Sequence, residues 1–187
     1  MIVVAPSVSV GSTKFRGRHD HRAHSKYRVG FPAPWRSALA DASPGDRGEL
    51  YAFIHPGGAI TVLPTSYKEA LLDAVDFWAH DRASELLLIF GEEMSFCGAD
   101  VRPDPQGRIV FPRQLCDYAG VAREPRDEMI WVGKGAYAEL WRGERWDDRM
   151  KTGRYSAPHG CEWSRDDVRE LAAAYETTIR TITGVIR

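Results

Sequence analysis

Short apolar runs separated by turn residues make up much of the central chain. A proline–glycine turn at 56–58 and a glycine–lysine–glycine turn at 133–135 each lie between two such runs. Since glycine adopts the positive φ values that tight turns need, both stretches are predicted to be β-hairpins. The predicted strands are 50–54, 59–63, 129–132 and 136–140.

Other segments have the composition and spacing of helices. Ser66 and Glu69 form a capping-box pattern that predicts a helix reaching Trp78, and the apolar stretch 83–90 predicts another. Shorter helices are predicted after Pro32 and Pro112, because proline is favoured at helix starts, and the second ends at a glycine. Helices therefore follow the strands at several points along the chain.

The C-terminal segment carries the clearest amphipathic pattern. Ser164, with acidic residues directly after it, opens a predicted helix in which apolar residues recur every three or four positions. Packing on the core or between subunits is the first interpretation of this face, and a face for a separate partner is the alternative. The face consists of Val168, Leu171, Tyr175, Ile179 and Ile182.

Two parts of the chain repeat one another. Arg28, Phe31 and Pro32 recur 80 positions later as an arginine, a phenylalanine and a proline, and the order strand, helix, strand, strand follows both times. This predicts an α+β protein built from two related β-rich domains with short helices and a C-terminal helix. The predicted units are 14–80, 81–153 and a helical extension over 154–187, with 1–13 as an N-terminal extension.

Charge is distributed unevenly. The formal net charge is −1, yet the stretch from Lys14 to Arg28 holds six basic residues and one acid. Concentrated positive charge on a mildly acidic body is typical of a phosphate-binding surface. A solvated basic strand without a ligand is the alternative. The six are Lys14, Arg16, Arg18, Arg22, Lys26 and Arg28.

These motifs resemble those of the MraZ family of bacterial transcription regulators. The segment from Asp104 to Arg108 matches the family's Asp-x-x-Gly-Arg motif, and Phe15-Arg16-Gly17 is similar to its N-terminal start. The resemblance covers residues 14 to 150. It implies two domains of the AbrB/SpoVT swapped-hairpin type. It also implies a cytoplasmic, nucleoid-associated, ring-shaped homo-oligomer that binds direct repeats in double-stranded DNA upstream of a cell-division and cell-wall gene cluster.

The resemblance also implies site residues. Lys and Arg neutralise phosphates, and Arg can bind a guanine edge with two hydrogen bonds. The predicted DNA-binding set is Lys14, Arg16, Arg18, Arg22, Lys26, Arg28 and Arg108. The predicted structural positions of the two motifs are His24, Tyr27, Asp104, Gly107, Pro32 and Pro112.

The first motif departs from the family pattern. His24 stands at the position of the family's aspartate, and Tyr27 at that of its glycine. If that position has a positive φ, a tyrosine strains or reshapes the turn. The first motif is therefore expected either to recognise a different DNA sequence or to bind more weakly. Loss of DNA binding by this repeat is the alternative.

Several other functions are disfavoured. No phosphate loop or hydrolase motif is present, so no enzymatic activity, cofactor or small-molecule substrate is expected. His19 and His21 share a strand face but lie among basic residues, so no metal is expected there. The run of apolar residues needed for a membrane span is missing. The acids Glu139, Glu144, Asp147 and Asp148 are expected to be solvated.

The cysteines and the C-terminal helix bear on the remaining alternatives. Cys97, Cys116 and Cys161 are far apart in the sequence and are predicted to be buried free thiols rather than disulfide or zinc ligands. The competing function is an AbrB-like oligomeric module that acts through protein partners, using residues beyond Gly153.

Overall fold

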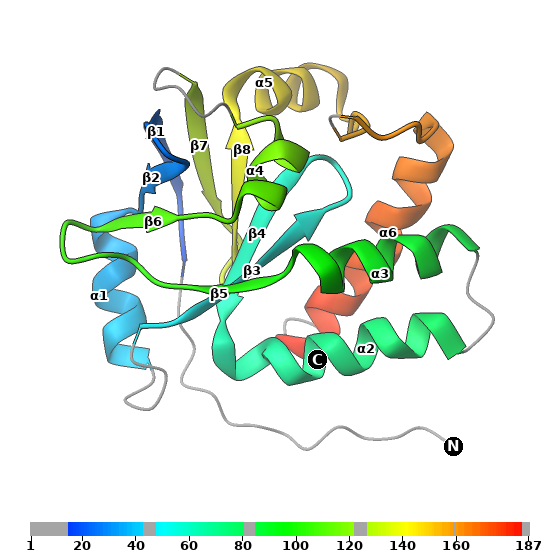
Figure 1. Ribbon diagram of the computed structural model, residues 1–187, viewed down its shortest axis with the longest axis horizontal. Helices are drawn as coiled ribbons and strands as arrows, with labels where there is room; N and C mark the ends of the chain where they lie inside the picture. Colours follow the sequence, from blue (N-terminus) through cyan, green and yellow to red (C-terminus); the bar gives the residue numbers. More distant parts are fainter. Residues whose placement is uncertain (1–14, 43–47, 81–84, 122–126, 159, 185–187) are drawn as a thin grey trace.

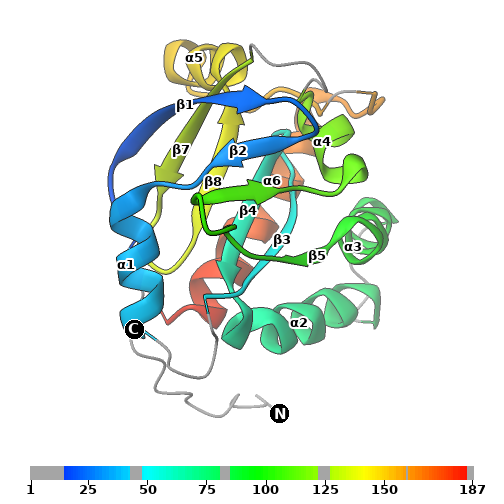
Figure 2. The ribbon, with the colours of Figure 1, turned by 60° about the vertical axis from the view of Figure 1, so that its left-hand side comes forward.

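A computed structural model describes residues 15–42, 48–80, 85–121, 127–158 and 160–184. Among them, eight strands form one antiparallel sheet in the order β5-β3-β4-β8-β7-β1-β2-β6, which curves toward a barrel (Figure 1, Figure 2). The α+β class is confirmed. The strands are β1 Arg18–His24, β2 Arg28–Gly30, β3 Leu50–His55, β4 Ala59–Pro64, β5 Ala99–Val101, β6 Arg108–Val110, β7 Glu128–Gly133 and β8 Ala138–Arg142.

The two predicted hairpins are confirmed. β3 and β4 pair from Leu50 with Pro64 to His55 with Ala59, and every residue of both strands is buried. β7 and β8 pair around the second glycine turn. β8 begins two residues later than predicted, because the amide of Lys134 donates to the carbonyl of Tyr137 at 2.9 Å and thereby draws these residues into the turn.

Seven helical segments surround the sheet in the described residues. Pro32 and Pro112 come directly before the helices that they were predicted to open, and their carbonyls accept first-turn amides of α1 and α4. α4 ends at Gly120, whose φ is 69°. The segments are α1 Ala33–Ala42, the 3-10 turn η1 Thr65–Tyr67, α2 Lys68–His80, α3 Glu85–Cys97, α4 Arg113–Ala119, α5 Gly143–Thr152 and α6 Arg165–Ile182.

Two helix predictions need correction. The chain from Thr65 to Tyr67 forms a 3-10 turn, so α2 begins at Lys68 rather than at a Ser66 cap. α3 continues seven residues beyond the predicted end at Phe90, because Met94 extends its buried face. The side chain of Trp78 lies outside the described residues.

α6 packs against the sheet and against α2 and α3. Its capping box is present: the Ser164 hydroxyl accepts from the amide of Asp167, whose carboxylate accepts from the amide of Ser164. Four residues of the predicted apolar face are buried, and Ile182 is half-buried. The Tyr175 hydroxyl shares a 2.5 Å hydrogen bond with Thr61 of β4. The apolar face of α6 is therefore used within the chain.

The interior corrects two further predictions. Glu139 was expected to be solvated, but β8 carries it inward, where it is 2 % exposed and accepts a hydrogen bond from the Trp141 indole at 2.9 Å. Glu144, Asp147 and Asp148 are exposed as predicted. All three cysteines are free, but only Cys116 is buried, whereas Cys97 and Cys161 are half-buried. Burial raises the pKa of the Cys116 thiol to about 12.

Strands from both predicted repeats share the sheet. β1 pairs with β7, β2 with β6, β3 with β5 and β4 with β8, so each of these ladders joins one strand from each half of the chain. No helix in the described part of the chain has the length and apolar character to cross a bilayer. The two halves contribute jointly to one core.

Candidate nucleic-acid interface

β1 presents a basic outer face. Alternate residues of this strand point outward, so that Arg18, Arg22 and His24 are exposed on one side together with Asp20. Arg18 donates to the Asp20 carboxylate at 2.9 Å. Arg16, just before the strand, is also exposed, and its carbonyl accepts from the Trp35 indole at 2.9 Å. The backbone under these cations is thus held in place while their side chains reach solvent.

The inner face of β1 has a packing role. The ring of His19 meets Trp35 edge-on at 4.9 Å between centroids, and His21 lies against Gly30 of the next strand. Burial and the neighbouring His19 lower the pKa of His21. No cluster of three or more potential metal ligands occurs among the described residues. The half-buried rings of His19 and His21 thus both pack against neighbouring residues of the chain.

The turn between β1 and β2 has an uncommon backbone. Lys26 and Tyr27 have φ values of 64° and 57°, in the left-handed region that glycine adopts most easily. The Arg28 side chain folds back over this turn, and its Nε donates to the carbonyl of Ser25 at 3.1 Å. In the described residues Arg28 has no carboxylate partner. Its guanidinium therefore keeps an uncompensated charge close to the surface.

The turn before β6 is organised by a carboxylate. Asp104 accepts the amides of Gln106 and Arg108 at 2.9 and 2.8 Å, and its second oxygen accepts two N–H groups of the Arg108 guanidinium. These contacts lower the pKa of Asp104. Gly107 has a φ of 77°. The Arg108 charge is thus largely matched within its own turn.

The two turns lie side by side because β2 and β6 pair. Val29 is opposite Ile109, both buried, while the flanking pairs place Arg28 beside the exposed Val110 and Arg108 beside Gly30. The amide of Phe31 donates to the carbonyl of Gly107 at 2.8 Å, and that of Phe111 donates to the carbonyl of Tyr27 at 3.1 Å. Phe111 lies 80 residues after Phe31, and Gly107 lies 80 residues after Tyr27. The two bonds are therefore the same contact, made once in each direction between the two repeats.

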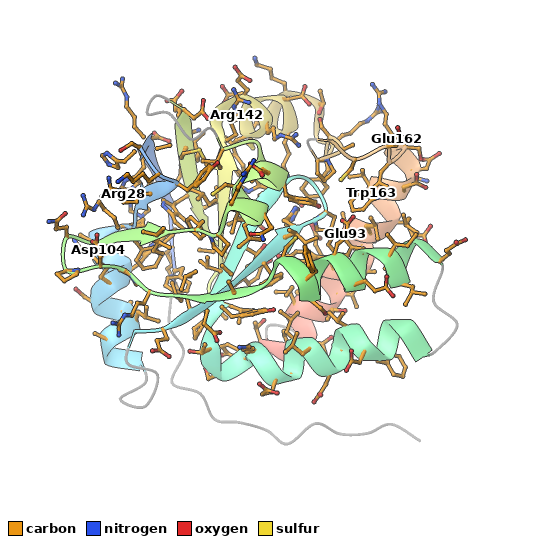
Figure 3. All side chains as sticks on the ribbon, in the orientation of Figure 1. Arg28, Glu93, Asp104, Arg142, Glu162 and Trp163 are labelled. Atoms are coloured by element: carbon orange, nitrogen blue, oxygen red, sulfur yellow. The ribbon has the colours of Figure 1, made fainter. Side chains whose placement is uncertain are left out.

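The predicted DNA-binding residues, with one exception, fall on this one region. Arg16, Arg18, Arg22, Lys26, Arg28 and Arg108 lie on β1, β2, β6 and their turns, and Lys14 lies outside the described residues. Figure 3 shows Arg28 and Asp104 on the same side of the molecule. We call this region, with its six described cations, the basic hairpin surface.

One neighbouring cation was missing from the predicted set. Arg36 is exposed on α1, and its guanidinium lies directly against Gly107, so that a β-carbon at that position would collide with it. Arg36 follows Pro32 by four residues, which places it one turn into the helix that the proline opens. Its position beside the second turn depends on how α1 packs, which the sequence does not show.

Comparison with known proteins identifies the family. No family model matches the chain. The transcriptional regulator MraZ of Paenarthrobacter aurescens (strain TC1) is 30 % identical over 137 residues, which is 73 % of this chain and 86 % of that protein. MraZ of Natranaerobius thermophilus is 30 % identical over 135 residues, which is 72 % of this chain and 85 % of that protein. MraZ of Clostridium acetobutylicum is 29 % identical over 136 residues.

The length and agreement of these matches support the predicted resemblance. They also agree with the expectation that the chain is not an enzyme, because each of these relatives is a transcriptional regulator. The chain belongs to the MraZ family of transcriptional regulators.

Proposed function

We propose that this protein is a sequence-specific DNA-binding regulator that contacts DNA through the basic hairpin surface. The observation that carries the proposal is the outward row of cations on β1, continued by Lys26 and Arg28 in the turn beside it. Phosphate contacts by such cations supply affinity, and an arginine that reaches a base edge supplies specificity.

Arg28 is the main reader in this proposal. Among the described residues its guanidinium hydrogen-bonds only to the carbonyl and hydroxyl of Ser25, whereas that of Arg108 is bound by Asp104. A guanidinium that already has a carboxylate partner must give up that partner to bind DNA, and this loss reduces the net free energy that DNA binding releases. The histidine at position 24, where the second turn has Asp104, therefore leaves Arg28 available.

The predicted duplication, with units 14–80 and 81–153, explains why two turns meet on one surface. The reciprocal bonds between Phe31 and Gly107 and between Phe111 and Tyr27 support it. The order of strands in the sheet also supports it. If β1, β2, β3 and β4 trade places with β5, β6, β7 and β8, and the order is read as a closed ring, the same order results. In this proposal one chain holds two swapped-hairpin units that face each other across β2 and β6.

Assembly and location complete the proposal. We infer that several copies form a ring-shaped homo-oligomer in the cytoplasm, associated with the nucleoid, and bind direct repeats upstream of a cell-division and cell-wall gene cluster. Repetition of a modest surface around an oligomer raises the affinity for repeated DNA sites through effective concentration.

The direct test is fluorescence anisotropy with labelled duplex DNA from upstream of the protein's own gene, with a scrambled duplex of equal length as control. Binding should be tighter to the upstream duplex. If the four described cations other than Arg28 and Arg108 each contact a phosphate, affinity should fall roughly 10²-fold between 50 and 200 mM salt. Equal binding to both duplexes would refute sequence specificity.

The alternative function is an oligomeric protein-interaction module without DNA binding. The conformation of Tyr27, which has the φ of a glycine turn, is the observation that favours it, because a reshaped turn could fail to fit the groove. A folded oligomer that binds neither duplex at 50 mM salt would support this alternative.

A further inference from the structure

α3 exposes large apolar side chains on its outward face. Leu88, Ile89 and Phe96 are 37 %, 42 % and 78 % exposed. Ile89 and Phe96 are two helical turns apart and so lie in one line along the helix. The opposite face holds the buried Phe90 and Met94, and Phe90 meets the ring of Trp163 at 5.8 Å. A helix that is apolar all round is normally covered on both faces, but the described residues cover only one face of α3.

The charges around this face are acidic. Together α2 and α3 carry six acidic residues and one lysine, and that lysine, Lys68, is bound to Asp100 at 2.8 Å. Glu85 and Glu92 are exposed on the same side of α3 as the apolar residues. Neither has an ion-pair partner among the described residues. The face therefore combines apolar anchors with uncompensated negative charge.

A cavity of about 450 Å³ lies next to the C-terminal end of α3. Ser95 and Gly98 line it from the end of α3, Leu72 lines it from α2, and Tyr51 lines it from β3. Ser95 and its neighbour Phe96 point in different directions on the helix, and neither Ile89 nor Phe96 lines the hollow. The hollow is therefore separate from the apolar line on α3.

We propose that the outward face of α3 binds a basic amphipathic segment of another protein. Charge selects this occupant: two copies meeting face to face through α3 would bring like charges together, which costs free energy. A copy docked here through its basic hairpin surface would cover the cations proposed to bind DNA. Lysine or arginine beside an apolar stripe would match both features of the face, with anchors on Ile89 and Phe96 and cations near Glu85 and Glu92. The apolar face of α6 is already buried and is not open to a partner.

This face is remote from the basic hairpin surface. Figure 3 shows Glu93 of α3 on the side of the molecule opposite Arg28, and Figures 1 and 2 both separate α3 from β1 and β2. DNA and the basic segment would therefore bind at the same time. The chain would connect a DNA site to a second protein.

The test uses the full chain and a labelled 14-residue helical peptide with leucines at i, i+3, i+4 and i+7 and lysines at the other positions. A peptide with glutamate in place of lysine is the charge control. The binding variant is Ile89→Ser with Phe96→Ser, both on the solvent side of α3. Met150→Ser, at an apolar residue on α5 whose exposed fraction of 65 % lies between those of Ile89 and Phe96, is the matched control variant.

We expect the lysine peptide to bind at least tenfold more tightly than the glutamate peptide. The double variant should bind it at least tenfold more weakly, while Met150→Ser binds it normally and both variants retain the DNA affinity of the wild type. Equal binding by wild type and double variant, or no binding by either, would overturn the proposal. A smaller assembly mass of the double variant in sedimentation would also overturn it and assign this face to a second copy.

Discussion

Tyr27 and Gly107 occupy matching positions in the two turns and share a left-handed backbone with different consequences. Gly107 adopts a φ of 77° without steric cost, whereas Tyr27 adopts 57° with a side chain that packs partly on the core. The packing of the tyrosine ring offsets the backbone strain in the first turn. The sequence identified both positions as motif residues, but only the structure shows that the tyrosine keeps the conformation of a glycine.

Gly107→Ala should destabilise the protein by about 1–2 kcal/mol, because an L-residue is strained at positive φ. The exposed Arg36 guanidinium that faces this position is the end of a flexible side chain and can move aside, so the backbone accounts for the effect. Chemical denaturation of the variant and of Gln106→Ala, a control in the same turn at an exposed residue, measures it. Equal stability of the two variants would contradict the described turn.

The burial of His55 should make the stability of the protein sensitive to mild acid. It is fully buried, its Nδ1 accepts the amide of Gly57 at 2.9 Å, and its Nε2 has no hydrogen-bond partner in the described structure. Burial, together with Arg149 and Lys134, holds its pKa well below the usual 6.5. Tyr155, Tyr175 and Trp141 pack around the ring, and Glu139 lies 3.8 Å from Nε2.

Because the folded state resists protonation of His55, the unfolded state binds more protons below pH 6.5. The free energy of unfolding should then fall with decreasing pH by up to about 1.4 kcal/mol per pH unit. Burial raises the pKa of Glu139, which acts in the opposite direction at lower pH. His55→Asn keeps an acceptor for Gly57 and removes the titration. Its melting temperature should fall less than that of the wild type between pH 6.5 and 5; parallel curves would exclude His55 as the cause.

At the scale of elements, the docking of α6 is the most testable feature. Its apolar residues were predicted from spacing alone, since a 3.6-residue repeat puts them on one face whatever they contact. Leu171→Ala should lower the free energy of unfolding by about 2–5 kcal/mol, because it leaves a cavity in the core. Denaturation of Arg169→Ala, on the exposed face of the same helix, provides the control and should change it by less than about 0.5 kcal/mol. Similar values for both would mean that α6 does not pack as described.

Local patterns predicted some elements better than others. Both glycine-turn hairpins and the proline-led helices appear where predicted, since turn and cap residues act on their immediate neighbours. The Ser66 pattern failed because the chain makes a 3-10 turn there before α2 begins. Glu139 was misassigned because its burial depends on residues outside its own strand: Lys134 and Arg149 lie 3.7 and 3.6 Å from its carboxylate.

At the scale of the whole molecule, pairing between distant strands makes the candidate site. The turn at Lys26 and the turn at Gly107 meet because β2 pairs with β6, and β1 joins them to β7. Sequence patterns show which side chains of a strand point inward, but they do not show which distant strand pairs with it. The resemblance to the family supplied the motif residues, and the structure adds their relation to one another, including the pairing of Asp104 with Arg108 and the position of Arg36.

Opposite charges mark opposite sides of the molecule. The ribbon separates β1 and β2 from α2 and α3 in both of its orientations (Figure 1, Figure 2). Such a separation would orient the protein as it approaches DNA, because the phosphates attract the basic hairpin surface and repel the α2–α3 region. In the proposed function this side, and Arg28 in particular, contacts the DNA.

The most direct measurement is the affinity of Arg28→Ala, Arg108→Ala and the control Arg169→Ala for the upstream duplex, with the fold of each verified by circular dichroism. Arg28→Ala should weaken binding roughly tenfold or more, given about 1–3 kcal/mol for a good arginine–guanine pair. Arg108→Ala should weaken it less, because Asp104 already holds that guanidinium, and Arg169→Ala should bind normally. Equal loss for Arg28→Ala and Arg108→Ala, or loss for Arg108→Ala alone, would contradict the assignment of Arg28 as the main reader.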